Sequence, residues 1–320
     1  MLVPTATIQL TTASGMPWTL IGRSWAADGT SLAIPELKLL FDCGAPIIRW
    51  PPAVALLSHT HNDHIQSIHL LKSPRNPPTL HVPTEAAPFL ERYFHAHQEL
   101  SDCLTEAESQ GGGTYKETIK LVSHDPEEEF VFRQRGQEYV CRTLACDHRI
   151  PCLGYSLHRR QHKLKDEFKG LPGQEIGQLR KQGVEITKSV EEPLVCLMGD
   201  TTTRVFETYP DVLVTHDVVV VECTFIHDTE ISNAEQHKHV HWSSLRPFIE
   251  QHPSTLFVLI HFSVRHSASE LRRFFVENTP HRNVHPLLLE DDLLRESHQS
   301  SNPIPLPPCN CFRCSPNESR

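Results

Sequence analysis

The chain has 320 residues, of which 38% are hydrophobic and 22% charged, the balance of an ordinary globular protein. Its net charge of −9 excludes a generally cationic nucleic-acid coat but leaves room for a local basic patch. No apolar run approaches the roughly 18 residues that a membrane span needs, and the first ten residues do not resemble a secretory signal. We therefore expect no membrane partner and a reducing, cytoplasmic location, where the ten cysteines are thiols or metal ligands.

Short strands and helices alternate along most of the chain, which predicts an α/β architecture in one domain over residues 1–299. Apolar runs bounded by turn residues predict strands at 37–41, 54–57, 131–132, 139–145, 194–198, 212–214, 218–221 and 256–260. Helices are predicted at 65–72, at 84–97 with Thr84 as its N-cap, at 243–251 and at 268–277.

A histidine-rich run directly follows the predicted buried strand at 54–57. In an extended segment alternate side chains share a face, so His59, His61 and Asp63 point the same way, and His64 falls where a helix begins. Imidazoles and carboxylates are the ligands that suit Zn²⁺ and related divalent ions. A solvated polar loop is the alternative, but four ligand-type residues within six positions favour a metal site.

Three further ligand-type residues follow predicted strands downstream. His148 comes after the strand at 139–145, Asp200 after 194–198, and His261 after 256–260. Each of them alone is more typical of a cap or turn residue. Together with the first run they indicate one site held at the ends of several strands.

In their order these motifs resemble the metallo-β-lactamase superfamily, and more narrowly the ribonuclease Z family of tRNA 3′-processing endonucleases. The narrower resemblance is carried by Asp-His-Arg-Ile-Pro-Cys-Leu-Gly-Tyr at 147–155, Glu-Cys-Thr-Phe at 222–225 and Leu-Ile-His-Phe-Ser-Val-Arg-His at 259–266. It implies an αβ/βα sandwich of the metallo-β-lactamase fold, formed by a single domain with a short inserted arm.

The resemblance also implies roles for individual residues around two divalent metal ions, with zinc as the expected metal. The implied ligands are His59, His61 and His148 for one ion, Asp63, His64 and His261 for the other, and Asp200 between them. Asp63 would also orient the nucleophile or accept its proton. His239, oriented by Glu222, would protonate the leaving group, and His241 is the alternative because spacing alone does not choose between them.

A basic stretch at 158–183 lies where the resemblance implies an arm that clamps tRNA. The stretch 158–182 carries seven Lys and Arg residues against three acids, and the alternative is a solvated helix with balanced charges. Phosphate contacts are expected from Arg159, Arg160, Lys163, Lys165, Arg180 and Lys181. Ser263 and Arg265 are expected to hold a substrate phosphate, and the alternative for Arg265 is a pair with a nearby acid.

The resemblance implies a metal-dependent hydrolase that removes 3′ trailers from precursor tRNA and leaves a 3′-hydroxyl. RNA would then be its substrate partner, and homodimerisation is left open. One alternative is a phosphodiesterase of the same fold acting on small or cyclic nucleotides. The other is a non-catalytic, metal-bearing RNA-binding subunit. Residues 300–320 are interpreted as a flexible tail, in which Cys309, Cys311 and Cys314 form an incomplete zinc-ligand set.

Overall fold

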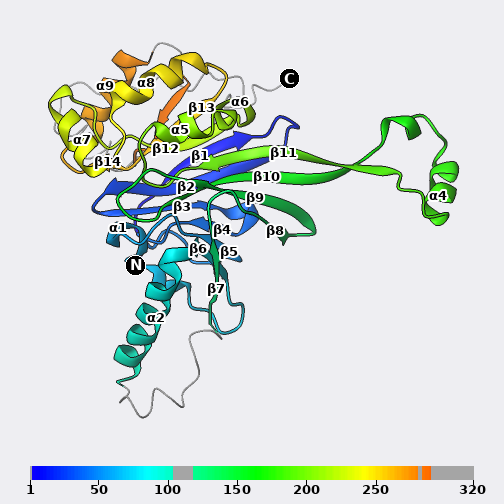
Figure 1. Ribbon diagram of the computed structural model, residues 1–320, viewed down its shortest axis with the longest axis horizontal. Coiled ribbons are helices and arrows are strands. Elements are labelled where there is room, and N and C mark those ends of the chain that lie inside the picture. Colours follow the sequence, from blue (N-terminus) through cyan, green and yellow to red (C-terminus); the bar gives the residue numbers. More distant parts are fainter. Residues whose placement is uncertain (1, 104–117, 280–282, 290–320) are drawn as a thin grey trace.

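The computed structural model describes residues 2–103, 118–279 and 283–289 (Figure 1). The predicted cysteine-containing tail, 300–320, lies outside these residues. Two mixed β-sheets pack against each other, with helices on their outer faces (Figure 1). This arrangement confirms the predicted αβ/βα sandwich. Within the described ranges, none of the helices has the length and hydrophobicity needed to cross a bilayer.

The first sheet has eight strands, seven of which lie in chain order from β1 to β7. Strands β1 to β4 are antiparallel, whereas β4 to β7 are parallel. The short β14, Phe262–Ser263, joins the sheet beside β2. The strands are β1 Ala6–Thr11, β2 Pro17–Ala26, β3 Gly29–Ile34, β4 Leu39–Phe41, β5 Val54–Leu56, β6 Thr79–Pro83 and β7 Lys120–His124.

The second sheet has seven strands in the order β15-β13-β12-β11-β10-β9-β8. Its central strands β12 and β13 are buried along their whole length, as their unbroken apolar runs require of strands covered on both faces. The strands are β8 Glu129–Gln134, β9 Gln137–Ala145, β10 Leu153–Leu164, β11 Thr187–Leu197, β12 Val218–Glu222, β13 Leu256–Ile260 and β15 Val284–Pro286.

Helices cover the two outer faces and leave an apolar core between the sheets. The helix α2, Ala87–Asp102, packs on the first sheet through Leu90 and Phe94. In the described part of the chain, four helices pack on the second sheet: α5 Arg204–Thr208, α6 Asp211–Thr215, α8 Trp242–Gln251 and α9 Ala268–Asn278. The short α7, Ile231–His237, precedes α8. Between the sheets, the buried Tyr155 donates a hydrogen bond to the carbonyl of Leu57 over 2.7 Å.

Three sequence predictions of local structure were wrong. Residues 65–72 do not form one helix, because α1, Asn62–Ile65, ends before the 3-10 turn Ile68–Leu71. The helix predicted at 84–97 begins as a 3-10 turn, Thr84–Ala86, continues as α2 to Asp102, and has no side-chain cap. Residues 212–214 are helical because the chain turns at Pro210 and buries Val212 against the second sheet.

Strands β10 and β11 continue beyond the sandwich as a two-stranded projection, which we call the arm (Figure 1). At its end lie a 3-10 turn, Asp166–Phe168, and the helix α4, Gly173–Lys181. The pairing of β10 with β11 shifts register between Leu157 and His158. Strand β10 stays paired with β9 as far as Arg160, so the two-stranded part begins after that residue. The projection includes the first half of β11 and so extends beyond residue 183.

Candidate active site

The chain brings nine His, Asp and Glu side chains together at the ends of strands from both sheets. The run from His59 to His64 follows β5 and enters α1. His148 lies in the β9–β10 connection, and Asp200 and His261 follow β11 and β13. Glu222 ends β12, and His239 lies between α7 and α8. Since the backbone at strand ends is fixed by its ladder, these side chains are positioned by rigid elements.

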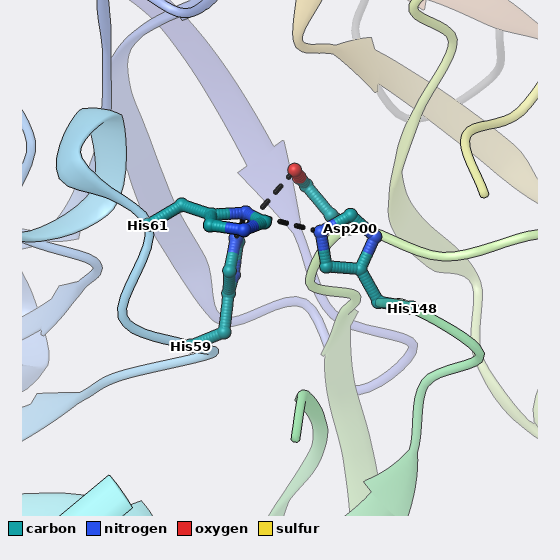
Figure 2. Close-up of side chains that lie close together, drawn as sticks. All are labelled: His59, His61, His148 and Asp200. Atoms are coloured by element: carbon teal, nitrogen blue, oxygen red, sulfur yellow. Dashed lines mark hydrogen bonds and ion pairs between the residues drawn. The ribbon is translucent and has the colours of Figure 1, made fainter. Parts of the chain in front are cut away.

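Four of these side chains form the first donor group, drawn in Figure 2. His61 Nδ1 lies 3.0 Å from His59 Nε2 and 3.1 Å from His148 Nε2. Asp200 Oδ2 is 3.7 Å from His59 Nε2. One donor atom from each residue lies within 4.8 Å of the others.

A second donor group consists of Asp63, His64 and His261. His261 Nε2 is 3.2 Å from Asp63 Oδ2 and 3.3 Å from His64 Nε2. The buried carboxylate of Asp200 connects the two groups, because Oδ1 is 3.5 Å from His64 Nε2 and Oδ2 is 3.4 Å from His261 Nε2. The structure thus brings together the seven residues that the sequence suggests as metal ligands, in the expected grouping.

Hydrogen bonds on the far side of the imidazoles hold their other nitrogens toward the centre. Ser58 Oγ is 2.9 Å from His59 Nδ1, the Lys238 carbonyl is 3.2 Å from His148 Nδ1, and Thr224 Oγ1 is 3.0 Å from His261 Nδ1. Such outer partners fix the tautomer of metal-binding histidines. This donor set of imidazole nitrogens and carboxylate oxygens therefore fits divalent transition-metal ions.

The protonation states of the histidines in the first group also suit metal binding. Burial lowers the pKa of His59 well below its usual range, and burial beside His148 lowers the pKa of His61 to about 4. Both rings are therefore neutral at pH 7, as a metal ligand must be.

Asp42 is a contributor to this site that sequence reasoning missed. It is fully buried at the end of β4, accepts hydrogen bonds from the Ser58 backbone N–H and hydroxyl, and lies 2.7 Å from His64 Nδ1. Its φ of +55° is unusual for a residue other than glycine and is best tolerated by Asp and Asn. The Asp-Cys-Gly sequence after an apolar strand was the available signal, but the partner is 22 residues away.

Beside the donor groups, Glu222 and His239 form a close pair. His239 Nδ1 is 2.8 Å from Glu222 Oε1. The other Glu222 oxygen accepts hydrogen bonds from Thr224 Oγ1 and the Val240 N–H, so the carboxylate is firmly held. Burial opposes protonation of His239, but the adjacent Glu222 carboxylate outweighs it and raises the pKa of His239 to about 9. The imidazole ring stacks on that of His261.

His241, the alternative to His239, makes other contacts. Its Nδ1 accepts the Ser243 N–H at the start of α8, and its Nε2 is 2.9 Å from the carbonyl of His227. Both ring nitrogens are thereby committed to local structure. The geometry favours His239 as the histidine available at the centre.

The basic residues of the arm fall into two sets. At its base, Arg159 pairs with Glu192, and Arg160 pairs with Glu191 and two further glutamates, Glu129 and Glu138. These carboxylates occupy the guanidinium groups, so the structure does not favour either arginine as a phosphate contact. Farther out, Lys163, Arg180 and Lys181 are exposed, and Lys165 pairs weakly with the exposed Glu185 over 3.4 Å.

The two predicted phosphate-binding residues outside the arm lie just after His261. Ser263 is buried in β14, and its N–H donates to the Thr224 carbonyl. Arg265 is exposed, and its N–H donates to Ser263 Oγ over 3.4 Å. Both residues lie in the segment that directly follows His261, a member of the second donor group.

Comparison with known proteins places the chain among named relatives. It is 32% identical over 259 residues to tRNase Z TRZ1 of Arabidopsis thaliana, covering 78% of this chain and 87% of the relative. It is 34% identical over 179 residues to a nuclear ribonuclease Z of Triticum aestivum, covering 53% of this chain and 91% of the relative. No family model matches the chain.

Similar solved structures include the short form of human tRNase Z, with a TM-score of 0.42 and 16% identity, covering 82% of this chain and 94% of that one. Another is the metallo-β-lactamase fold protein YhfI of Bacillus subtilis, with a TM-score of 0.49 and 14% identity, covering 90% and 98%.

The two-sheet sandwich, with clustered histidines and aspartates at its strand ends, defines a hydrolase of the metallo-β-lactamase fold. Within that class, the extent and identity of the match to tRNase Z TRZ1 are decisive. The chain belongs to the tRNase Z family, also called ribonuclease Z.

Proposed function

We propose that this protein is a metal-dependent endoribonuclease that removes 3′ trailers from precursor tRNA, with two zinc ions at its centre. The observation that carries the proposal is that two connected donor groups and the Glu222–His239 pair converge at one place. His59, His61, His148 and Asp200 would hold one ion. Asp63, His64, His261 and the shared Asp200 would hold the other.

When bound, a pair of divalent ions supplies Lewis-acid activation and neutralises charge on a phosphodiester. Asp63 Oδ2 accepts the Ala27 N–H over 2.8 Å, which fixes the carboxylate beside His261. In that position Asp63 orients the attacking water and accepts its proton.

His239 acts on the other side of the reaction as the general acid. Glu222 occupies its Nδ1, so Nε2 is left to donate a proton to the 3′-oxygen of the departing tRNA ribose. An expelled ribose alkoxide is strongly basic, so this proton is needed in the transition state and contributes about 10²- to 10⁴-fold in rate.

The experiment compares two substrates that differ in their need for an acid. A precursor tRNA with a 3′ trailer expels an alkoxide, whereas bis(p-nitrophenyl) phosphate expels a stable phenolate. His239→Asn is expected to slow precursor cleavage at least about 100-fold and to slow the small ester much less. His237→Asn, two residues earlier at the end of α7, is the control. Equal losses on both substrates would refute the assignment of His239 as acid.

The outer arm carries the proposed RNA contact through Lys163, Lys165, Arg180 and Lys181. Changing these residues to serine is expected to weaken precursor cleavage and flatten its salt dependence, because fewer phosphates are neutralised. Turnover of the small ester should not change. Unchanged precursor cleavage would contradict the role of the arm and favour a hydrolase of small phosphodiesters. Equal losses on both substrates would contradict an RNA-specific role.

The remaining parts of the proposal concern the setting of the enzyme. Seven cysteines in the described residues have free thiols, six of them buried, which supports a reducing compartment such as the cytoplasm. Pairing with a second copy of the chain is also proposed, and light scattering of the purified protein tests it.

A further inference from the structure

A third cluster of ligand-type side chains lies apart from both donor groups and shares no residue with them. It consists of His227, His266 and Glu270, one donor atom of each lying within 4.8 Å of the others. His227 precedes the 3-10 turn Asp228–Glu230, His266 follows β14, and Glu270 lies in the first turn of α9. The cluster therefore joins two segments about 40 residues apart in the chain.

The distances within the cluster suit a small cation. His227 Nε2 is 2.7 Å from Glu270 Oε1, and His266 Nδ1 is 3.6 Å from Glu270 Oε2. Glu270 Oε2 also accepts the Ser267 N–H over 3.3 Å, which holds the carboxylate in place. Tetrahedral zinc with ligand bonds of about 2 Å separates its ligand atoms by roughly 3.3 Å, so only small side-chain shifts are needed.

His266 supplies an independent observation. Its side chain is only 4% exposed, and Nε2 has no hydrogen-bond partner although Glu230 Oε2 lies 3.2 Å away. Glu230 is itself anchored by the N–H groups of Ile226 and His227. A cation on Nδ1 would fix the proton on Nε2, where it can be donated to Glu230, the outer-partner arrangement typical of metal-binding histidines.

The charges point the same way. Both histidines lie within ion-pair distance of the carboxylates of Glu230 and Glu270. With neutral imidazoles, Glu270 and the adjacent Glu230 together place two negative charges at this partly buried position. A divalent cation balances them, and His227, whose side chain is 46% exposed, provides access from solvent.

We infer that His227, His266 and Glu270 bind a divalent transition-metal ion of the zinc type at a site separate from the candidate active site. Binding of the ion at His227 Nε2 replaces the hydrogen of the His227–Glu270 contact. Three protein ligands leave a fourth position for water. The ion links the start of α9 to the segment before α7. In that segment the backbone carbonyl of His227 also accepts a hydrogen bond from His241 Nε2.

Metal content tests this inference without reference to activity. The purified full chain is loaded with Zn²⁺, freed of excess metal by gel filtration, and its zinc is counted per chain by mass spectrometry. Glu270→Gln is compared with Glu277→Gln, an exposed glutamate two turns later on α9. We expect Glu270→Gln to lose one equivalent and Glu277→Gln to lose none. His227→Asn, at an exposed ligand, should lose the same single equivalent.

Optical spectra of the cobalt-loaded protein provide a second measurement. The d–d absorption of Co²⁺ in wild type minus that in His227→Asn should give the spectrum of one tetrahedral or five-coordinate ion. Equal metal content in wild type and both ligand variants would overturn the inference and leave the cluster as a histidine–carboxylate network. Loss of every equivalent from folded His227→Asn would overturn it as well, because the effect would not be confined to this cluster.

Discussion

Replacing Asp42 with asparagine tests whether a carboxylate outside the donor groups controls them. Asn has the same shape and tolerates the positive φ of this position. The side-chain carbonyl of the asparagine can still accept a hydrogen bond from the Ser58 N–H. In the wild type His64 Nδ1 lies 2.7 Å from Asp42 Oδ2, and in the variant it would face the asparagine NH2 group instead. A donor at that point turns Nδ1 into an acceptor and moves the ring proton to Nε2, the nitrogen that faces the centre.

The magnitude follows from this change of tautomer. Loss of such an outer partner typically lowers metal affinity about 10- to 100-fold, which corresponds to roughly 1.4–2.8 kcal/mol. Because His64 belongs to the donor group with Asp63 and His261, the protein should bind only one of its metal equivalents more weakly.

The assay is competition with a chromophoric zinc chelator, combined with turnover of bis(p-nitrophenyl) phosphate at controlled free zinc. Asp42→Asn should release one equivalent at lower chelator concentration and recover turnover when zinc is raised. Asp28→Asn, an exposed aspartate paired with Arg23, is the control. Unchanged zinc release would refute the reasoning, as would a loss of turnover that zinc does not restore.

Three further predictions concern the scaffold. Gly44→Ala would place a Cβ 1.8 Å from the Asp63 carbonyl oxygen, so we expect about 3 kcal/mol of destabilisation in urea unfolding, together with loss of zinc. Tyr155→Phe removes the buried hydrogen bond to Leu57 and should cost about 1–2 kcal/mol in the same measurement, with zinc content unchanged. Burial lowers the pKa of His216 to about 3 in the folded chain. As the pH drops below 6.5, the unfolded chain binds a proton at this imidazole that the folded chain does not bind, so the free energy of unfolding falls. His216→Gln should remove about 2 kcal/mol of the stability difference between pH 7 and pH 5; an unaltered pH dependence would contradict this.

The sequence predicts most of the layered architecture because its strong signals are local. Strands β12 and β13 are continuous apolar runs, and the dense run of histidines after β5 is typical of a metal site at a strand end. Residues 212–214 misled the same reasoning, since an apolar triplet is compatible with a buried strand or with one buried side of a short helix.

The candidate site is less accessible to sequence reasoning where it depends on pairing across the fold. The excess of basic residues at 158–182 includes Arg159 and Arg160, but the register of β10 with β11 sets Glu192 and Glu191 directly opposite them. Those two glutamates lie outside residues 158–182, over which the charges were counted. The local count therefore overstated the number of basic side chains that are free to bind phosphate. The choice between His239 and His241 depended likewise on which of them meets Glu222.

Strand β10 has a mechanical consequence for substrate choice. Its 12 residues run without a break from the end that follows the His148 loop into the arm, a distance of about 36 Å at the usual rise per residue. Because the ladder with β11 stiffens the strand, the arm is held at a nearly constant distance from the candidate active site, and the register shift after Leu157 sets its angle. A small phosphodiester is too short to span this distance. Under the proposed function, an RNA long enough to span it would gain from two linked contacts, so length as well as chemistry would separate substrates.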